Sequence, residues 1–224
     1  LDNHCTAGKL KREFGEKIRI MFEVTDESAV SGKTWDNSYI PVLPGIVEYG
    51  MEKRYEKFIK ESPHKKFILN STAFIKAVNE SGKSWTAGNF LNITNSISLS
   101  LLKETAGCSG AIPSLELSAS QIRSMADKSP LPLYLFLYSP LKLMTTRQCL
   151  FSGRICGKKT TDKECYYNCS KQGAIDEIGG RSLKILKRKF RFTELYDSSY
   201  MCVPEISEIL SDKAGGFVID LRDI

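Results

Sequence analysis

Short apolar segments alternate with helical patterns along most of the chain, and this alternation constrains the fold more than any other feature. The last apolar segment before the cysteines, PLYLFLY at 132–138, is the most apolar and is predicted to be buried on both faces, as parallel strands are. The alternation predicts an α/β sheet or part of a (β/α) barrel. Strands are predicted at 18–24, 39–46, 65–72, 88–95, 111–117 and 132–138, and helices at 48–61, 73–80, 96–107 and 118–127.

Two of these helices carry end signals in the sequence. Ser118 is a suitable N-cap, and Gln121 three residues later completes a capping box. The helix at 96–107 is predicted to be capped by Ser96 or Ser98 and to end at Gly107.

A cluster of cysteines follows the last predicted parallel strand. Four of the seven cysteines fall between positions 149 and 169, with six, eight and three residues between them: Cys149, Cys156, Cys165 and Cys169. Four thiolates can close a tetrahedral zinc site or hold an iron–sulfur cluster. Two disulfides in an oxidising compartment and unrelated buried thiols are the alternatives. The crowding favours a metal or a cluster, and Cys5, Cys108 and Cys202 are predicted to be bystander thiols.

The chain beyond the cysteines changes in character. Residues 182–197 alternate apolar and basic side chains, which predicts an antiparallel hairpin. A short helix is predicted at 207–213 and a final strand at 216–224. The basic residues of the hairpin, which include Lys187, Arg188 and Arg191, lie among phenylalanines and are candidates for RNA contact through phosphates and stacking. The alternative is a solvated strand face.

Composition sets broader limits. The 224 residues, 42% of them hydrophobic, are enough to bury a core, and the net charge of +6 suits a nucleic acid or an anionic small molecule without specifying either. No segment resembles a secretory signal or a membrane span, so a cytoplasmic protein with reduced thiols and no membrane association is expected. No Gly-rich phosphate loop is present, so no nucleotide cofactor is expected. The sequence shows no Ser-His-Asp set and no HExxH motif, and neither His4 nor His64 is predicted to be catalytic.

Two regions are predicted from these patterns. Residues 1–147 are predicted to form an α/β, barrel-like region, either a whole barrel or part of one. Residues 148–224 form a cysteine-rich metal or cluster segment with a β-hairpin and a closing strand, packed on the same domain.

Several motifs, in order and spacing, resemble the collagenase-like peptidase family U32, in its later, barrel-closing half. The resemblance covers roughly residues 65 to 205, and departs from the family pattern at Ser114-Leu115-Glu116-Leu117, where S-P-E-L is usual, and at Ser139-Pro140, where Gly-Arg is usual. The segments that carry it are FILNSTAFIKAV, FLNITNS, IPSLELSASQIRSM, PLYLFLYSPLKLMTTRQC, the spaced cysteines, KFRF and LYDSSYMCVPEI.

The resemblance implies an incomplete or distorted TIM-type barrel whose four cysteines bind a [4Fe–4S] cluster. It also implies hydroxylation of RNA bases, in tRNA or rRNA, or of a quinone precursor without molecular oxygen. The older peptidase activity of the family is one alternative, and a zinc-stabilised interaction domain without catalysis is another. With only about six strands visible in the sequence, the missing half-barrel is expected from the same protein or from a partner subunit.

Catalytic candidates follow from the same resemblance. Asn92, Asn95 and Glu116 are predicted at the C-terminal ends of strands, where barrel enzymes place their chemistry. Each has a structural alternative, because asparagines form turns and a carboxylate stabilises the start of a following helix.

Overall fold

The computed structural model describes residues 9–10, 12–24, 39–152, 156–157, 169–176, 180, 182–187, 192–210, 212 and 214–222. The chain divides into two compact units, Leu1–Tyr134 and Leu135–Ile224, whereas the predicted regions divide after residue 147. None of the helices in the described ranges is long and apolar enough to cross a membrane.

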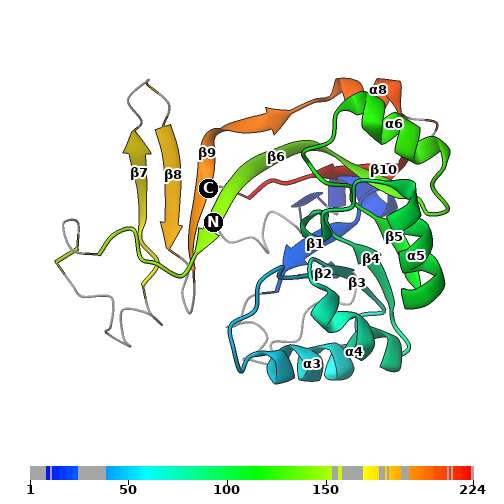
Figure 1. Cartoon of the computed structure of the whole chain (residues 1–224), viewed down its shortest axis with the longest axis horizontal. Helices are drawn as coiled ribbons and strands as arrows, with labels where there is room; N and C mark the ends of the chain where they lie inside the picture. The colour runs from blue at the N-terminus through cyan, green and yellow to red at the C-terminus, as the bar shows by residue number, and fades with distance from the viewer. Residues whose placement is uncertain are drawn as a thin grey trace. The chain divides into compact units, whose positions relative to one another are not determined.

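The first unit is a parallel sheet (Figure 1). Each strand pairs in parallel with the next one along the chain, and β5 pairs with the start of β6 through Ala111 and Leu133. This order confirms the α/β class and the parallel strands, while the incomplete TIM-type barrel stays a prediction. The strands are β1 (Ile20–Glu23), β2 (Tyr39–Leu43), β3 (Lys66–Leu69), β4 (Ser84–Ala87), β5 (Cys108–Ala111) and β6 (Leu133–Thr146).

Helices connect the strands from β2 to β6, and α3 and α4 lie side by side (Figure 1). Tyr55 of α3 packs against Phe74 with ring centroids 5.4 Å apart, and both side chains are almost fully buried. Phe67 and Trp85, aligned on β3 and β4, are also buried. The helical elements are η1 (Gly15–Lys17), α3 (Glu52–Glu61), η2 (Thr72–Phe74), α4 (Ile75–Glu80), η3 (Asn89–Leu91), α5 (Ser96–Ala106) and α6 (Ala119–Asp127).

The predicted helix ends are partly correct. The capping box of α6 is confirmed, since Ser118 and Gln121 bond each other's backbone N–H groups. Gly107 ends α5 in the left-handed region with φ 68°, as predicted. The predicted serine caps of α5 are wrong, because the Asn95 side chain accepts the Ser98 N–H instead.

Two strand predictions are also wrong in position. The segment 88–95 holds the 3-10 helix η3 and not a strand, and β4 lies before it at Ser84–Ala87. The strand predicted at 111–117 is the short β5, which ends at Ala111.

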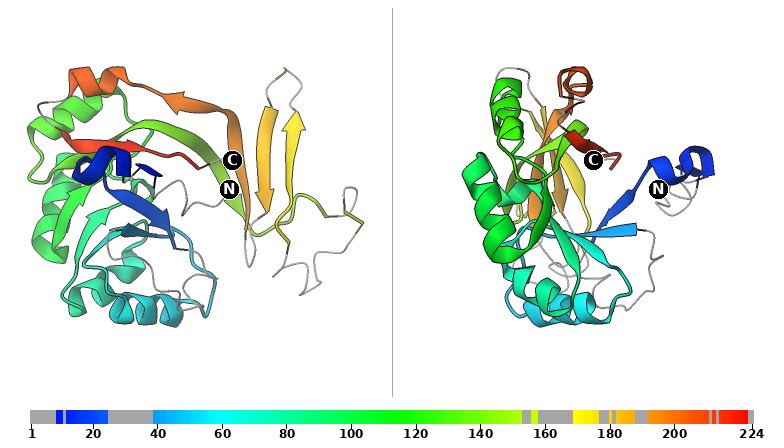
Figure 2. Two further views of the ribbon diagram at one scale, coloured as in Figure 1. Left: turned by 180° about the vertical axis from the view of Figure 1, so that it is seen from behind. Right: turned by 90° about the vertical axis from the view of Figure 1, so that its right-hand side faces the viewer.

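The second unit is an antiparallel arrangement in the strand order β6-β9-β8-β7, with β10 also paired to β6. Figure 2 shows β6 and β9 as long neighbouring strands. The predicted hairpin is confirmed as β8 and β9, but β7 was not predicted. The helix and the strand predicted at 207–213 and 216–224 lie slightly earlier. The elements are β7 (Gln172–Asp176), β8 (Ser182–Lys187), β9 (Thr193–Cys202), α8 (Glu205–Ile209) and β10 (Ala214–Ile219).

The buried phenol of Tyr55 makes the stability of the protein sensitive to alkaline pH. Burial, and secondarily the Glu23 carboxylate, raise the pKa of Tyr55 above its ordinary value of 10.0. Above pH 10 the phenol of Tyr55 loses its proton in the unfolded chain but keeps it in the folded chain. This difference lowers the free energy of unfolding by up to about 1.4 kcal/mol for each pH unit. Urea unfolding from neutral to alkaline pH should show a shallower decline in Tyr55→Phe than in the parent protein. Equal declines in the two proteins would contradict this role for Tyr55.

Candidate functional site

Asn70 lies where β3 ends and holds together the loops at the carboxyl edge of the first unit. Its side-chain Oδ1 accepts a hydrogen bond from the Phe90 backbone N–H at 3.3 Å. A Cβ atom on Gly88, the residue after β4, would lie only 2.0 Å from that oxygen. Gly88 therefore gives the Asn70 amide its position, because any other residue would force the amide to move.

The same hydrogen bond fixes which way the amide faces. Since Oδ1 takes the backbone N–H, the Nδ2 group is the end that is left to donate. No residue in the described parts of the chain accepts from Nδ2, although Asn70 is only 8% exposed. Asn70 is not among the predicted site residues, although it directly follows the apolar run of β3, and the end of a strand is the position that predicts a role for Asn92.

The predicted catalytic asparagines both have structural roles. Asn92 ends η3 in the left-handed region with φ 53°, a conformation that asparagine tolerates better than most residues. Asn95 accepts the Ser98 N–H at 2.9 Å as the N-cap of α5. The structure thus places both in the loop after β4, in the turn-forming roles given as their alternative.

Glu116 lies in the neighbouring loop, which follows β5. This loop is tied to the one after β4 by the Ser114 N–H, which donates to the Ile93 carbonyl at 3.0 Å. The Glu116 side chain is exposed, and the helix that follows is capped by Ser118 and not by Glu116. Within the described ranges, the carboxylate makes no hydrogen bond or ion pair.

The first two cysteines of the cluster lie on a turn that is docked onto β7. The Cys156 N–H donates to the Phe151 carbonyl at 3.0 Å, and the Ser152 hydroxyl donates to the Cys149 carbonyl at 2.9 Å. Phe151 is buried, and its ring would lie 2.7 Å from a Cβ on Gly173. Cys169 precedes β7 by three residues, so the turn of Cys149 and Cys156 packs through Phe151 on the strand that follows Cys169.

The chemistry of the donor set fits an iron–sulfur cluster or zinc, since four thiols are what either group takes. Cys165 lies outside the described residues. Those residues contain no group of three or more His, Cys, Asp or Glu side chains arranged around a common metal position. The cluster ligands therefore stay a prediction.

Cys108 differs from the clustered cysteines. Its side chain is buried at the start of β5, and burial raises the pKa of its thiol. A raised pKa keeps the sulfur protonated and unreactive, which agrees with its prediction as a bystander.

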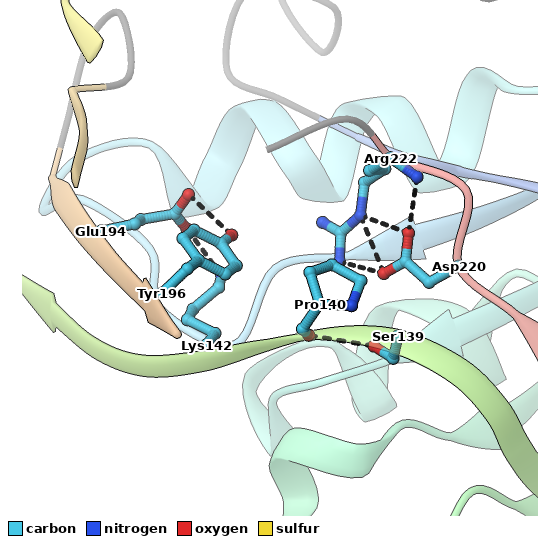
Figure 3. A network of polar contacts seen from close by, with 7 residues as sticks. All are labelled: Ser139, Pro140, Lys142, Glu194, Tyr196, Asp220 and Arg222. Atoms are coloured by element: carbon cyan, nitrogen blue, oxygen red, sulfur yellow. Dashed lines mark hydrogen bonds and ion pairs between the residues drawn. The ribbon is translucent and has the colours of Figure 1, made fainter. Parts of the chain in front are cut away.

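A nearly buried polar group joins β6 to β9 in the second unit (Figure 3). The Lys142 ammonium lies 2.5 Å from one oxygen of Glu194, and the Tyr196 hydroxyl donates to the other oxygen at 3.1 Å. The lysine and glutamate side chains are 14% and 10% exposed. The sequence does not predict this group, because Lys142 lies 52 residues from Glu194.

The predicted RNA-contact residues of the hairpin are only partly described. Lys187 lies at the end of β8 and is 4% exposed, so its side chain does not stand on the surface. Arg188 and Arg191 lie outside the described residues. RNA binding by this hairpin stays a prediction.

Comparison with known proteins identifies the family. The family model described as Peptidase family U32 matches residues 50–205. No significant match was found among curated proteins or among solved structures.

Proposed function

Because the chain belongs to peptidase family U32, we propose that it is the iron–sulfur domain of an enzyme that hydroxylates RNA bases or a related aromatic substrate. The observation that carries this proposal is the set of four thiols between positions 149 and 169. A set of this size and spacing in one short segment is typical of cluster or zinc binding.

The fold of the described cysteines supports the proposal. Phe151 anchors the turn that carries Cys149 and Cys156, and its contact with Gly173 holds that turn beside the strand that follows Cys169. A bound cluster would be held by Cys149, Cys156, Cys165 and Cys169. When bound, such a cluster supplies one-electron redox chemistry, and replacing a ring C–H by C–OH is a two-electron oxidation.

The test is anaerobic purification followed by an absorbance spectrum and analysis of iron, sulfide and zinc. We expect a broad band near about 400 nm with about four iron and four sulfide per chain. A Cys165→Ala/Cys169→Ala double variant should lose the band and the iron. Cys202→Ala is the matched control, because Cys202 is exposed and lies outside the segment, and it should keep both.

Other results would favour the alternatives. One zinc per chain without colour would make the segment a structural site in an interaction domain. The family name makes a peptidase the second candidate. Hydrolysis of labelled gelatin that is unchanged in the double variant would favour the peptidase over the proposed hydroxylase.

A further inference from the structure

We infer that Gly173 is a positioning residue for the proposed metal site, because it leaves room on β7 for the Phe151 ring. This contact fixes the turn that carries Cys149 and Cys156, and so determines how tightly the bound metal is retained. The inference rests on the cysteine site of the proposed function and adds to it a residue that is not itself a ligand.

The first step is the presence of a glycine inside a strand. Gly173 belongs to β7 and is aligned with Ile185 on β8. Glycine weakens a strand, because it loses more conformational freedom on folding and has no side chain to pack. The backbone of Gly173 does not have a positive φ, so its conformation does not require glycine. The reason for a glycine at this position is therefore space.

The second step is the side chain that occupies this space. A Cβ atom on Gly173 would lie 2.7 Å from Cε1 of the Phe151 ring and 3.3 Å from its Cζ. Both distances are shorter than the optimal separation of about 3.5 to 4.0 Å between carbon atoms. Phe151 is 3% exposed, so its ring is packed and loses contacts when it moves. Any side chain at position 173 would therefore displace a buried ring.

The third step is the link from this ring to two of the thiols. The Phe151 carbonyl accepts a hydrogen bond from the Cys156 N–H at 3.0 Å. The Cys149 carbonyl accepts one from the hydroxyl of Ser152, the residue after Phe151, at 2.9 Å. Phe151 thus lies between the two cysteines within one hydrogen-bonded turn, and a displacement of its ring is transmitted to the backbone of both.

The other end of the cysteine segment is held to the same sheet. The Lys171 carbonyl, two residues after Cys169, accepts the Lys187 N–H of β8 at 2.8 Å. Attachment at both ends restricts the segment before a metal binds, which reduces the conformational entropy that is lost when four thiolates gather around it. Loss of the attachment at Phe151 therefore weakens metal binding, although all four thiols remain.

The experiment measures metal release from the full chain, purified without oxygen, to pyridylazoresorcinol, a chelator that becomes coloured with iron and with zinc. Gly173→Ala displaces the ring. Phe151→Leu/Gly173→Ala is the rescue variant, because leucine lacks Cε1 and Cζ, and the phenylalanine Cδ1, whose place a leucine methyl takes, lies 3.9 Å from the added Cβ. Gln172→Ala is the matched control, since it places alanine at the exposed neighbouring position of β7. Thermal unfolding checks that each variant is folded.

Gly173→Ala should release its metal about 10 to 100 times faster than the parent, the range by which metal affinity falls when a partner that orients a ligand is lost. The rescue variant and Gln172→Ala should release it at close to the parent rate. Release from Gly173→Ala at the parent rate, or equally fast release from the rescue variant and Gly173→Ala, would overturn the inference. A parent protein that holds neither iron nor zinc overturns both the inference and the proposed function. Zinc in the parent overturns only the proposed cluster, and the rates of zinc release then decide the role of Gly173.

Discussion

Lys142→Met should lower the free energy of unfolding by about 3 to 5 kcal/mol, because it removes the cation that pairs with the nearly buried Glu194 carboxylate. The ammonium lies 2.5 Å from Glu194 Oε1 and 5.8 Å from the centre of the Tyr196 ring. Methionine fills much of the volume of the lysine stem, so the loss reports the missing charge and not a cavity. Urea unfolding followed by circular dichroism measures the effect.

The double variant Lys142→Met/Glu194→Gln is the control for this interpretation. Glutamine keeps an acceptor for the Tyr196 hydroxyl, which donates to Glu194 Oε2 at 3.1 Å, but carries no charge. Most of the lost stability should therefore return. A double variant that is as unstable as Lys142→Met would show that the lysine stabilises β6 by packing alone.

Trp85→Ala should also cost about 3 to 5 kcal/mol, because it removes the largest buried side chain of the parallel sheet. Trp85 is aligned with Phe67 on β3 and with Cys108 on β5, so the cavity would open at the centre of three paired strands. The indole Nε1 also donates to the Ala106 carbonyl at 3.0 Å.

Trp85→Phe separates the two contributions. It loses the hydrogen bond and part of the volume, and should cost about 1 to 2 kcal/mol. Both variants are compared with the parent by urea unfolding. Equal losses for alanine and phenylalanine would mean that the hydrogen bond, and not the packed volume, is the main contribution.

The sequence predicts the fold class well, because the parallel order of β1 to β6 follows from the alternation of apolar and helical segments. It fails at 88–95, where the apolar residues Phe90, Leu91 and Ile93, bounded by glycine and asparagines, resemble a short strand. That segment instead turns through η3 and the left-handed Asn92. Periodicity over so few residues does not separate a strand from a turn that buries one side chain, here Ile93.

Some candidate site residues can be predicted from the sequence, and others cannot. The crowding of cysteines is a local signal that the sequence displays directly. The Asn70 side chain is positioned by Gly88 and Phe90, which lie in the loop after the next strand. Lys142 pairs with Glu194, which lies 52 residues away. One sequence does not reveal such distant partners, since no pattern of spacing links them.

The pairing of β6 with β9 also sets an order of events during synthesis. When β6 is synthesised, its parallel partner β5 has already been synthesised. Its antiparallel partner β9 comes later, because Glu194 on β9 follows Lys142 by 52 residues. At ribosomal rates this interval lasts about 3 to 10 s. All four clustered cysteines are made within that interval, so their segment leaves the ribosome as an open loop, and the strand pair that closes it forms only afterwards.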